Sequence, residues 1–99
     1  MVLLVNTTVR PNKVGVIDMK KIVRFTASWC GPCKSLAKNL EEVNSPIPIE
    51  VVDIDIHSDI AVEYGIRSVP TLVMMEENVV LKRLTGTKTT TELRNWIND

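Results

Sequence analysis

The two cysteines of this chain are separated by two residues, in the hexapeptide Trp29-Cys30-Gly31-Pro32-Cys33-Lys34. Two thiols at this spacing can close into a disulfide and open again, which is redox chemistry. An apolar run at residues 22–26 precedes the motif, and a segment with helical periodicity follows it. Where a strand gives way to a helix, the first cysteine falls at the helix N-terminus, whose N–H groups and dipole favour a thiolate. The thiolate is the attacking species in disulfide exchange.

Length and charge limit the class of protein. The chain has 99 residues, with 12 basic and 12 acidic side chains and a formal net charge of zero. This length predicts one domain over residues 1–99. The neutral charge, without a basic block, argues against a nucleic-acid partner. No apolar run approaches the roughly 20 residues of a membrane span.

The compartment is inferred from the N-terminus and the cysteines. The first residues lack the basic and apolar regions of a signal peptide, so we expect a cytoplasmic protein with no membrane partner. In a reducing compartment, a lone Cys-x-x-Cys is typical of catalysis rather than of a structural cross-link.

Apolar periodicity alternates between strand and helix along the chain. The expected strands cover residues 2–5, 22–26, 49–56, 71–75 and 79–84. The expected helices cover residues 31–44, 58–64 and the C-terminal segment after residue 89, with a further short helix around residues 12–19. This alternation predicts an α/β fold, in which a central mixed β-sheet of about five strands has helices on both faces.

Several residues mark where elements begin and end. Ser58 is a favourable N-cap for its helix, and Gly65 is a favourable residue just after it. Asn78 suits a positive φ in the hairpin turn. Thr89 and Glu92 form a capping-box pattern at the start of the last helix.

Three features of the sequence together resemble the thioredoxin family. The motif at residues 29–34 matches that family residue for residue. The run Tyr-Gly-Ile-Arg-Ser-Val-Pro-Thr-Leu at residues 64–72 matches the segment in which the family carries a cis-proline facing the dithiol, here Pro70. Gly86 follows sixteen residues after Pro70. The resemblance covers about residues 22–98 and implies the thioredoxin fold and dithiol-disulfide exchange.

Cys30 is expected to be the attacking thiol, because it lies nearer the helix start and should be the more exposed of the pair. Cys33 would resolve the mixed disulfide, while Gly31 and Pro32 set the turn. The resemblance implies that Pro32 also tunes how easily the disulfide is reduced. The alternatives are a packing disulfide, buried thiols, or half of a zinc site shared between two copies. A structural zinc needs four ligands, and this chain has two cysteines and one histidine. We therefore expect no metal and no bound cofactor.

Five residues are expected to form the rim of a substrate groove, in which an extended segment pairs with the backbone. They are Trp29, Ser68, Val69, Pro70 and Gly86. Trp29 is expected to be about half exposed, or alternatively to pack in the core. Pro70 could instead be an ordinary trans proline, and Gly86 could serve only a turn.

The chain departs from the family six residues before the first cysteine. Thioredoxins usually carry a buried aspartate there, which helps to move a proton at the second cysteine; here the residue is Arg24. The lysine that accompanies the aspartate corresponds to Val51. A guanidinium is not a base at neutral pH, so the usual proton relay is missing.

A buried, unpaired arginine is costly. We therefore predict that Arg24 forms an ion pair with Asp53 on the neighbouring strand, beneath the thiols. The alternative is that Arg24 reaches solvent. A cation near the thiols favours thiolate and makes the disulfide a stronger oxidant, and Lys34 adds modest positive potential.

Three further residues lie outside this set. His57, the only histidine, is expected on a loop or at the surface. Met74 and Met75 alternate on one strand, so at most one of them is expected in the core.

The sequence is identified as a small thioredoxin, a protein-disulfide oxidoreductase that reduces disulfides in partner proteins. A thioredoxin reductase or similar electron donor would recharge it, and we expect it to act as a monomer in cellular electron transport and redox homeostasis. One alternative is a glutaredoxin-like enzyme that depends on glutathione. Gly31-Pro32 argues against it, because glutaredoxins usually carry Pro-Tyr there, but Arg24 and the short chain leave it open. The other alternative is an interaction subunit of the same fold that needs no redox turnover.

Overall fold

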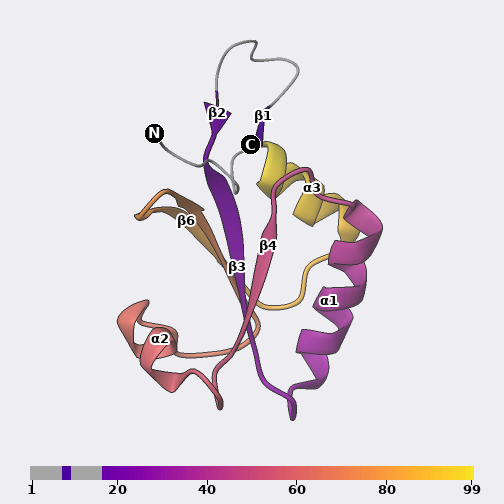
Figure 1. Ribbon diagram of the computed structural model, residues 1–99. Helices are drawn as coiled ribbons and strands as arrows, with labels where there is room; N and C mark the ends of the chain where they lie inside the picture. Colours follow the sequence, from indigo (N-terminus) through magenta and orange to yellow (C-terminus); the bar gives the residue numbers. More distant parts are fainter. Residues whose placement is uncertain (1–7, 10–16) are drawn as a thin grey trace.

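The computed structural model describes residues 8–9 and 17–99 (Figure 1). Its main sheet has four strands in the order β4-β3-β5-β6, and two short strands form a separate pair. The elements in chain order are β1 (Thr8–Val9), β2 (Ile17–Asp18), β3 (Lys20–Thr26), α1 (Gly31–Val43), β4 (Ile49–Asp53), α2 (Ser58–Glu63), β5 (Thr71–Glu76), β6 (Val79–Thr85) and α3 (Thr90–Asn98).

The predicted α/β architecture is confirmed, with a mixed main sheet of four strands among the described residues rather than about five. β3 runs parallel to β4 and antiparallel to β5, and β5 and β6 form an antiparallel hairpin. Phe25, near the end of β3, lies opposite both Val52 of β4 and Thr71 of β5. The end of β3, the end of β4 and the start of β5 therefore lie side by side at one end of the sheet. Figure 1 shows the ends of β3 and β4 there, next to the turn that leads into α1.

Helices cover both faces of the sheet. Helices α1 and α3 lie on one face, and α2 lies on the other (Figure 1). The core under α1 and α3 consists of Ile22, Leu36, Leu40, Ile47, Leu72, Met74, Leu93 and Ile97. The core on the α2 side consists of Val23, Phe25, Val52, Val73 and Met75.

Both methionines of β5 are buried, so the prediction that at most one lies in the core was wrong. Met74 belongs to the core under α1 and α3, and Met75 to the core on the α2 side. Side chains alternate between the two faces of a strand. Because both faces of β5 are covered, alternation places each methionine in a different core rather than one of them in solvent.

Helix α1 forms as predicted. Pro32 lies in its first turn, where a missing N–H costs nothing. Cys33, Leu36 and Leu40 are its buried residues, one or two turns apart. The helix ends at Asn44, which adopts a left-handed conformation with φ of 54°.

The end of β4 differs from the prediction of a strand over residues 49–56. Pairing stops at Asp53, whose carbonyl accepts hydrogen bonds from the N–H groups of Ile56 and His57. Because of this turn, α2 begins one residue earlier than predicted. His57, exposed at the surface as predicted, is therefore the N-cap, and Ser58 is the first helical residue, not the cap.

The hairpin turn also differs in detail. Glu77, not Asn78, takes the positive φ, at 57°. A positive φ at the first central residue of a two-residue turn suits the twist of the flanking strands. Gly65, with φ of 67°, follows α2 as predicted.

Two predictions concern the N-terminal part of the chain. The strand expected at residues 2–5 lies outside the described residues. Most of the helix expected over residues 12–19 also lies outside the described residues. Within its described part, Ile17–Asp18 forms the strand β2 and not a helix. Among the described residues, no helix is long and apolar enough to cross a membrane.

The predicted capping box at the start of α3 is present, and it makes stability depend on pH. The N–H of Thr89 donates to Glu92 Oε1, and the N–H of Glu92 donates to Thr89 Oγ1. Hydrogen bonds from the backbone and side chain of Thr89 lower the pKa of Glu92. A lowered pKa in the folded state means that the stabilisation is present above the ordinary glutamate pKa of about 4.3 and is lost as the pH falls through the folded-state value.

We expect Glu92→Gln to have a weaker acid dependence of unfolding free energy than the wild type, because glutamine accepts the same hydrogen bond without titrating. Urea unfolding of both proteins between about pH 7 and about pH 2 measures this difference. The matched control is Glu63→Gln, an exposed glutamate of α2. If the difference in unfolding free energy between the wild type and Glu92→Gln stays constant over this pH range, the prediction is contradicted.

Candidate active site

Cys30 and Cys33 form a disulfide at the start of α1. Cys30 is the N-cap of the helix and Cys33 lies one turn on, with Cα atoms 5.3 Å apart. The N–H of Cys33 donates a hydrogen bond to Cys30 Sγ at 3.1 Å. The sulfur of Cys30 thus occupies the position in which a helix N-terminus stabilises negative charge.

Both cysteines are nearly buried among apolar side chains. Cys30 is 4% exposed and Cys33 is 1% exposed, so Cys30 is the more accessible, as predicted, but by a small margin. Ala27 is buried against them, and Ile54 and Val69 pack at the edge of the same cluster. A group that reaches either sulfur must therefore come close to the backbone of this turn.

The loop before β5 lies against the disulfide. The Val69–Pro70 peptide bond is cis, as the family resemblance implied, and Val69 packs on the cysteine cluster. Gly86 donates its N–H to the carbonyl of Pro70 at 2.9 Å and has φ of 95°. Thr87, which the sequence analysis missed, donates from Oγ1 to the carbonyl of Pro32 at 3.2 Å. These bonds join the loop after β6 to both the proline loop and the start of α1.

Trp29 stands beside Cys30 and is 68% exposed, which is more than the half exposure predicted and excludes core packing. Its Nε1–H donates to Asp55 Oδ2 at 2.9 Å, which fixes the ring. Asp55 was missed as a partner for Trp29. Trp29 follows the end of β3 and Asp55 follows the end of β4, and these parallel strands end side by side, with Thr26 opposite Asp53. The parallel pairing of the two strands was the feature from which this contact could have been predicted.

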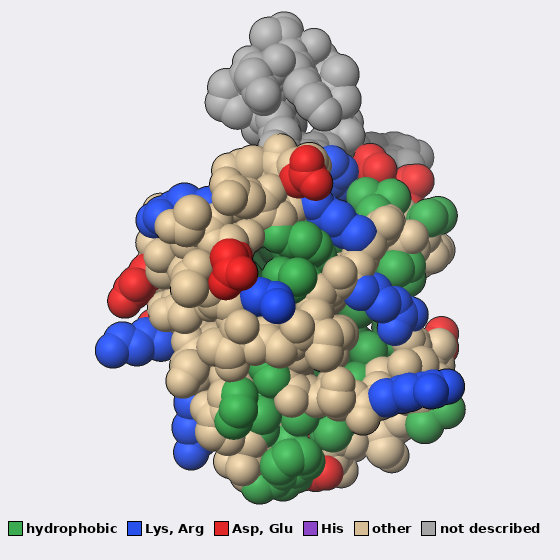
Figure 2. Space-filling model, turned by 180° about the vertical axis from the view of Figure 1, so that it is seen from behind, with side chains coloured by type: hydrophobic (Ala, Val, Ile, Leu, Met, Phe, Trp, Pro, Cys, Tyr) green, Lys and Arg blue, Asp and Glu red, His purple; other side chains and the backbone are tan. Residues whose placement is uncertain are grey.

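Large apolar side chains are exposed at this end of the sheet. They include Trp29, next to Cys30 in the chain, and Ile56, in the turn after β4, which is 72% exposed. Figure 2 shows hydrophobic side chains gathered at the end of the molecule that carries the turn between β3 and α1. Exposed apolar surface of this kind is typical of a site that contacts another protein.

Arg24 lies on β3 at the face covered by α1, between Val51 of β4 and Leu72 of β5. The predicted ion pair with Asp53 does not form: within the described ranges, Arg24 has no carboxylate partner. Arg24 is only half-buried and borders two open hollows, so its charge keeps contact with solvent. The alternative, in which the side chain reaches solvent, is therefore the one observed.

Arg24 and Asp53 nevertheless border the same hollow as Cys33. This hollow has a volume of about 230 Å³ and also contacts Lys34, which is exposed in the first turn of α1. Asp53 Oδ1 accepts the N–H of Asp55 at 2.8 Å. Partial burial lowers the pKa of Arg24 from its ordinary value. The hollow thus brings two positive charges and one negative charge close to Cys33.

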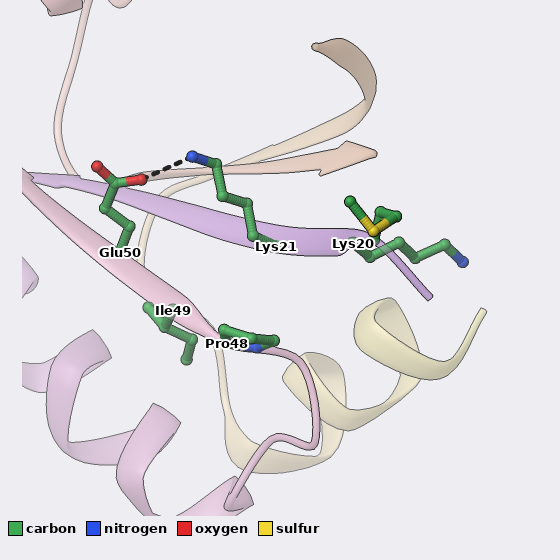
Figure 3. Close-up of a pocket in the computed structure, with 6 residues that line it drawn as sticks. Lys20, Lys21, Pro48, Ile49 and Glu50 are labelled. Atoms are coloured by element: carbon green, nitrogen blue, oxygen red, sulfur yellow. Dashed lines mark hydrogen bonds and ion pairs between the residues drawn. The ribbon is translucent and has the colours of Figure 1, made fainter. Parts of the chain in front are cut away.

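Another hollow, of about 220 Å³, lies at the opposite end of β3, and no cysteine lines it (Figure 3). Lys21 and Glu50 form an ion pair at its edge, with Nζ and Oε1 2.9 Å apart. In the part of the chain that the structure describes, no three His, Cys, Asp or Glu side chains are grouped to hold a metal ion.

Comparison with known proteins gives a consistent family. A sequence model described as Thioredoxin matches residues 5–99. Thioredoxin C-2 of Corynebacterium nephridii is 34% identical over 101 residues, covering 96% of this chain and 94% of the relative. Mitochondrial thioredoxin of Bos taurus is 38% identical over 80 residues, covering 77% of this chain; the match spans only 48% of that longer protein.

A solved structure agrees with these sequences. A mutant thioredoxin from Halobacterium salinarum NRC-1 superposes with a TM-score of 0.75 at 28% identity. The match covers 82% of this chain and 74% of that one. Both the sequence and the fold of the described residues therefore agree with the same family.

Gly86 is expected to be needed for its backbone conformation. A Cβ at this position would meet no atom within 4 Å, but φ of 95° strains any L side chain. We expect Gly86→Ala to lower the free energy of unfolding by about 1–2 kcal/mol. Gly31→Ala is the matched control, because Gly31 has equal space without a positive φ, and it should change stability by less than about 0.5 kcal/mol. Urea unfolding measures both, and equal effects would refute this role for Gly86.

Proposed function

The chain belongs to the thioredoxin family of thiol-disulfide oxidoreductases, and from that premise we propose that it reduces disulfides in partner proteins through Cys30 and Cys33. The observation that carries the proposal is the disulfide at the N-terminus of α1, where Cys30 Sγ accepts the N–H of Cys33. That position supplies a stabilised thiolate and a second thiol within bonding reach of it.

The reaction has two exchanges. In the dithiol form, the Cys30 thiolate attacks one sulfur of the substrate disulfide; a bond forms between them, and the other substrate sulfur leaves and takes a proton from water. Cys33 then loses its proton and attacks Cys30 Sγ. This closes the Cys30–Cys33 disulfide seen in the structure and releases the second substrate thiol. Two electrons have passed from the protein to the substrate.

The substrate is proposed to lie across the rim around the disulfide. Trp29 offers an exposed apolar surface beside Cys30, and Val69 packs against the sulfurs. Val69 offers its backbone N–H and carbonyl to an extended segment, while the carbonyls of Ser68 and Pro70 already accept hydrogen bonds from Thr71 Oγ1 and from the N–H of Gly86. Exposed backbone beside an apolar surface suits recognition of an extended peptide.

A separate reductase is proposed to return the disulfide to the dithiol form, so that electrons flow through the protein without a bound cofactor. We also propose that one copy is sufficient, as a single domain in a reducing compartment such as the cytoplasm. Both thiols and the whole rim come from one chain, and a lone Cys-x-x-Cys is typical of catalysis in such a compartment.

Arg24 and Lys34 are proposed to tune the reduction potential. Both border the hollow that Cys33 lines, where a positive charge stabilises thiolate over disulfide. Asp53, which borders the same hollow, moderates that charge. Stabilising the dithiol form makes the disulfide a stronger oxidant.

The proposed roles of the two cysteines, attack by Cys30 and resolution by Cys33, can be tested directly with single serine variants. We expect Cys33→Ser to accumulate a mixed disulfide with a disulfide-bonded peptide, because Cys30 attacks but nothing resolves the product. Cys30→Ser, the matched control, should form no adduct, since Cys33 lies inside the helix, 1% exposed, and lacks the N-cap position that stabilises a thiolate. Mass spectrometry of the intact protein distinguishes the two. Full biological activity in the Cys30→Ser, Cys33→Ser double variant would favour a redox-independent interaction subunit instead.

The charge at position 24 should appear in the reduction potential. We expect Arg24→Gln to lower it by about 10–30 mV, which corresponds to about 0.5–1.4 kcal/mol for a two-electron couple. The measurement is the oxidised fraction across a series of glutathione redox buffers. Arg94→Gln, an exposed arginine on α3, is the control and should leave the potential unchanged. An unchanged potential in Arg24→Gln would leave Arg24 a purely structural role.

A further inference from the structure

A small hollow with basic walls opens beside the proline loop. It has a volume of about 150 Å³, and its polar lining comes from Arg67, Ser68, Thr71, Arg83 and Thr85. It is separate from the hollow that Cys33 lines, since no residue contacts both. The site described above makes no use of it.

The sheet brings these side chains together. Thr71 at the start of β5 lies opposite Thr85 of β6, and Arg83 lies two residues before Thr85 on the same face of that strand. Arg67 and Ser68 come from the loop between α2 and β5. Thr71 Oγ1 donates to the carbonyl of Ser68 at 2.8 Å, which holds this loop against the strand.

The lining is suited to an anion. It holds two guanidinium groups and the hydroxyls of Ser68 and Thr85, and no carboxylate belongs to it; the hydroxyl hydrogen of Thr71 is already donated to Ser68. Neither Arg67 nor Arg83 forms an ion pair with any described residue, and both are exposed and free to meet a ligand. The planar fork of an arginine matches a carboxylate with two parallel hydrogen bonds.

The hollow adjoins the proposed path of the substrate. Ser68 lines the hollow and immediately precedes Val69, which packs against the disulfide. An extended chain advances about 3.3 Å per residue, so a residue two positions from the attacked cysteine lies about 7 Å along the strand. Residues two positions apart on an extended chain point to the same side, so this is the nearest residue that faces the protein together with the attacked cysteine.

We propose that this hollow binds an acidic side chain of the protein substrate, two residues from the cysteine that Cys30 attacks. The proposal rests on the proposed function and adds a substrate class to it: disulfides with a nearby aspartate or glutamate. The rim supplies apolar contact and backbone pairing, and the hollow supplies selection by charge. The carboxylate forms hydrogen bonds with Arg67 and Arg83 and takes no part in the exchange itself.

The experiment compares disulfide-bonded peptides that differ only by glutamate or glutamine at two residues before, or two residues after, the attacked cysteine. The measured quantity is kcat/KM for reduction by the full chain. For one of the two placements we expect the glutamate peptide to be reduced about threefold faster, which is typical of an exposed ion pair. The ratio should fall towards one in about 0.5 M salt, because exposed charges are screened.

Arg83→Gln should bring the ratio of glutamate to glutamine peptide close to one. Arg94→Gln removes the same charge from α3, which covers the opposite face of the sheet, and should keep the ratio of the wild type. Equal rates for glutamate and glutamine at both placements in the wild type would overturn the proposal while leaving disulfide reduction intact. So would a preference that Arg83→Gln retains.

A second measurement needs no turnover, so it separates this proposal from the proposed function. The same peptides with serine in place of cysteine are titrated into the isotope-labelled oxidised protein. We expect the glutamate peptide, and not the glutamine peptide, to shift the amide signals of residues 65–67 and 83–85, which lie outside the rim that both peptides contact. Absence of reduction for every peptide would refute the proposed function, while equal shifts with both peptides would refute the docking of an acidic side chain.

Discussion

The central strand β3 is the constraint on which the site depends. Ile22 and Phe25 are fully buried on opposite faces of it, so a one-residue slip would exchange the two cores. β3 pairs in parallel with β4 and in antiparallel with β5. The chain therefore leaves β3 at a fixed point, and Cys30 becomes the N-cap of α1 just beyond it. The start of β5 lies at the same edge, which brings Pro70 to the cysteines from forty residues away.

Patterns that depend on neighbours in the sequence could be predicted. Helix α1, the capping box of Thr89 and Glu92 and the β5–β6 hairpin all rest on local periodicity or local hydrogen bonds. The failures depend on tertiary structure. Ser58 is a good cap in isolation, but the turn closed on Asp53 delivers His57 to that position. Met74 and Met75 are both buried because the two faces of β5 are both covered, which alternation alone does not reveal.

The same distinction applies to the site. The pairing of Cys30 with Cys33 and the cis peptide bond before Pro70 follow from motifs, and the structure contains both the disulfide and the cis bond. The bond between Trp29 and Asp55 depends on where two strand ends meet, so the motif around Trp29 did not reveal it. Arg24 was expected to need a carboxylate because full burial was assumed. The structure leaves it half-buried beside open hollows, and water can then solvate its charge.

The replacement of a buried acid by Arg24 changes what the protein can do for Cys33. A carboxylate at that position could accept the proton that Cys33 must lose; a guanidinium cannot. The hollow that Cys33 lines is open rather than sealed, so water can reach its edge, and Asp53 borders it from β4. The proton therefore has a route through solvent that does not need an acid on β3. A positive charge beside this hollow opposes protonation of a thiolate, which is why position 24 is proposed to act on the equilibrium between dithiol and disulfide rather than as a proton carrier.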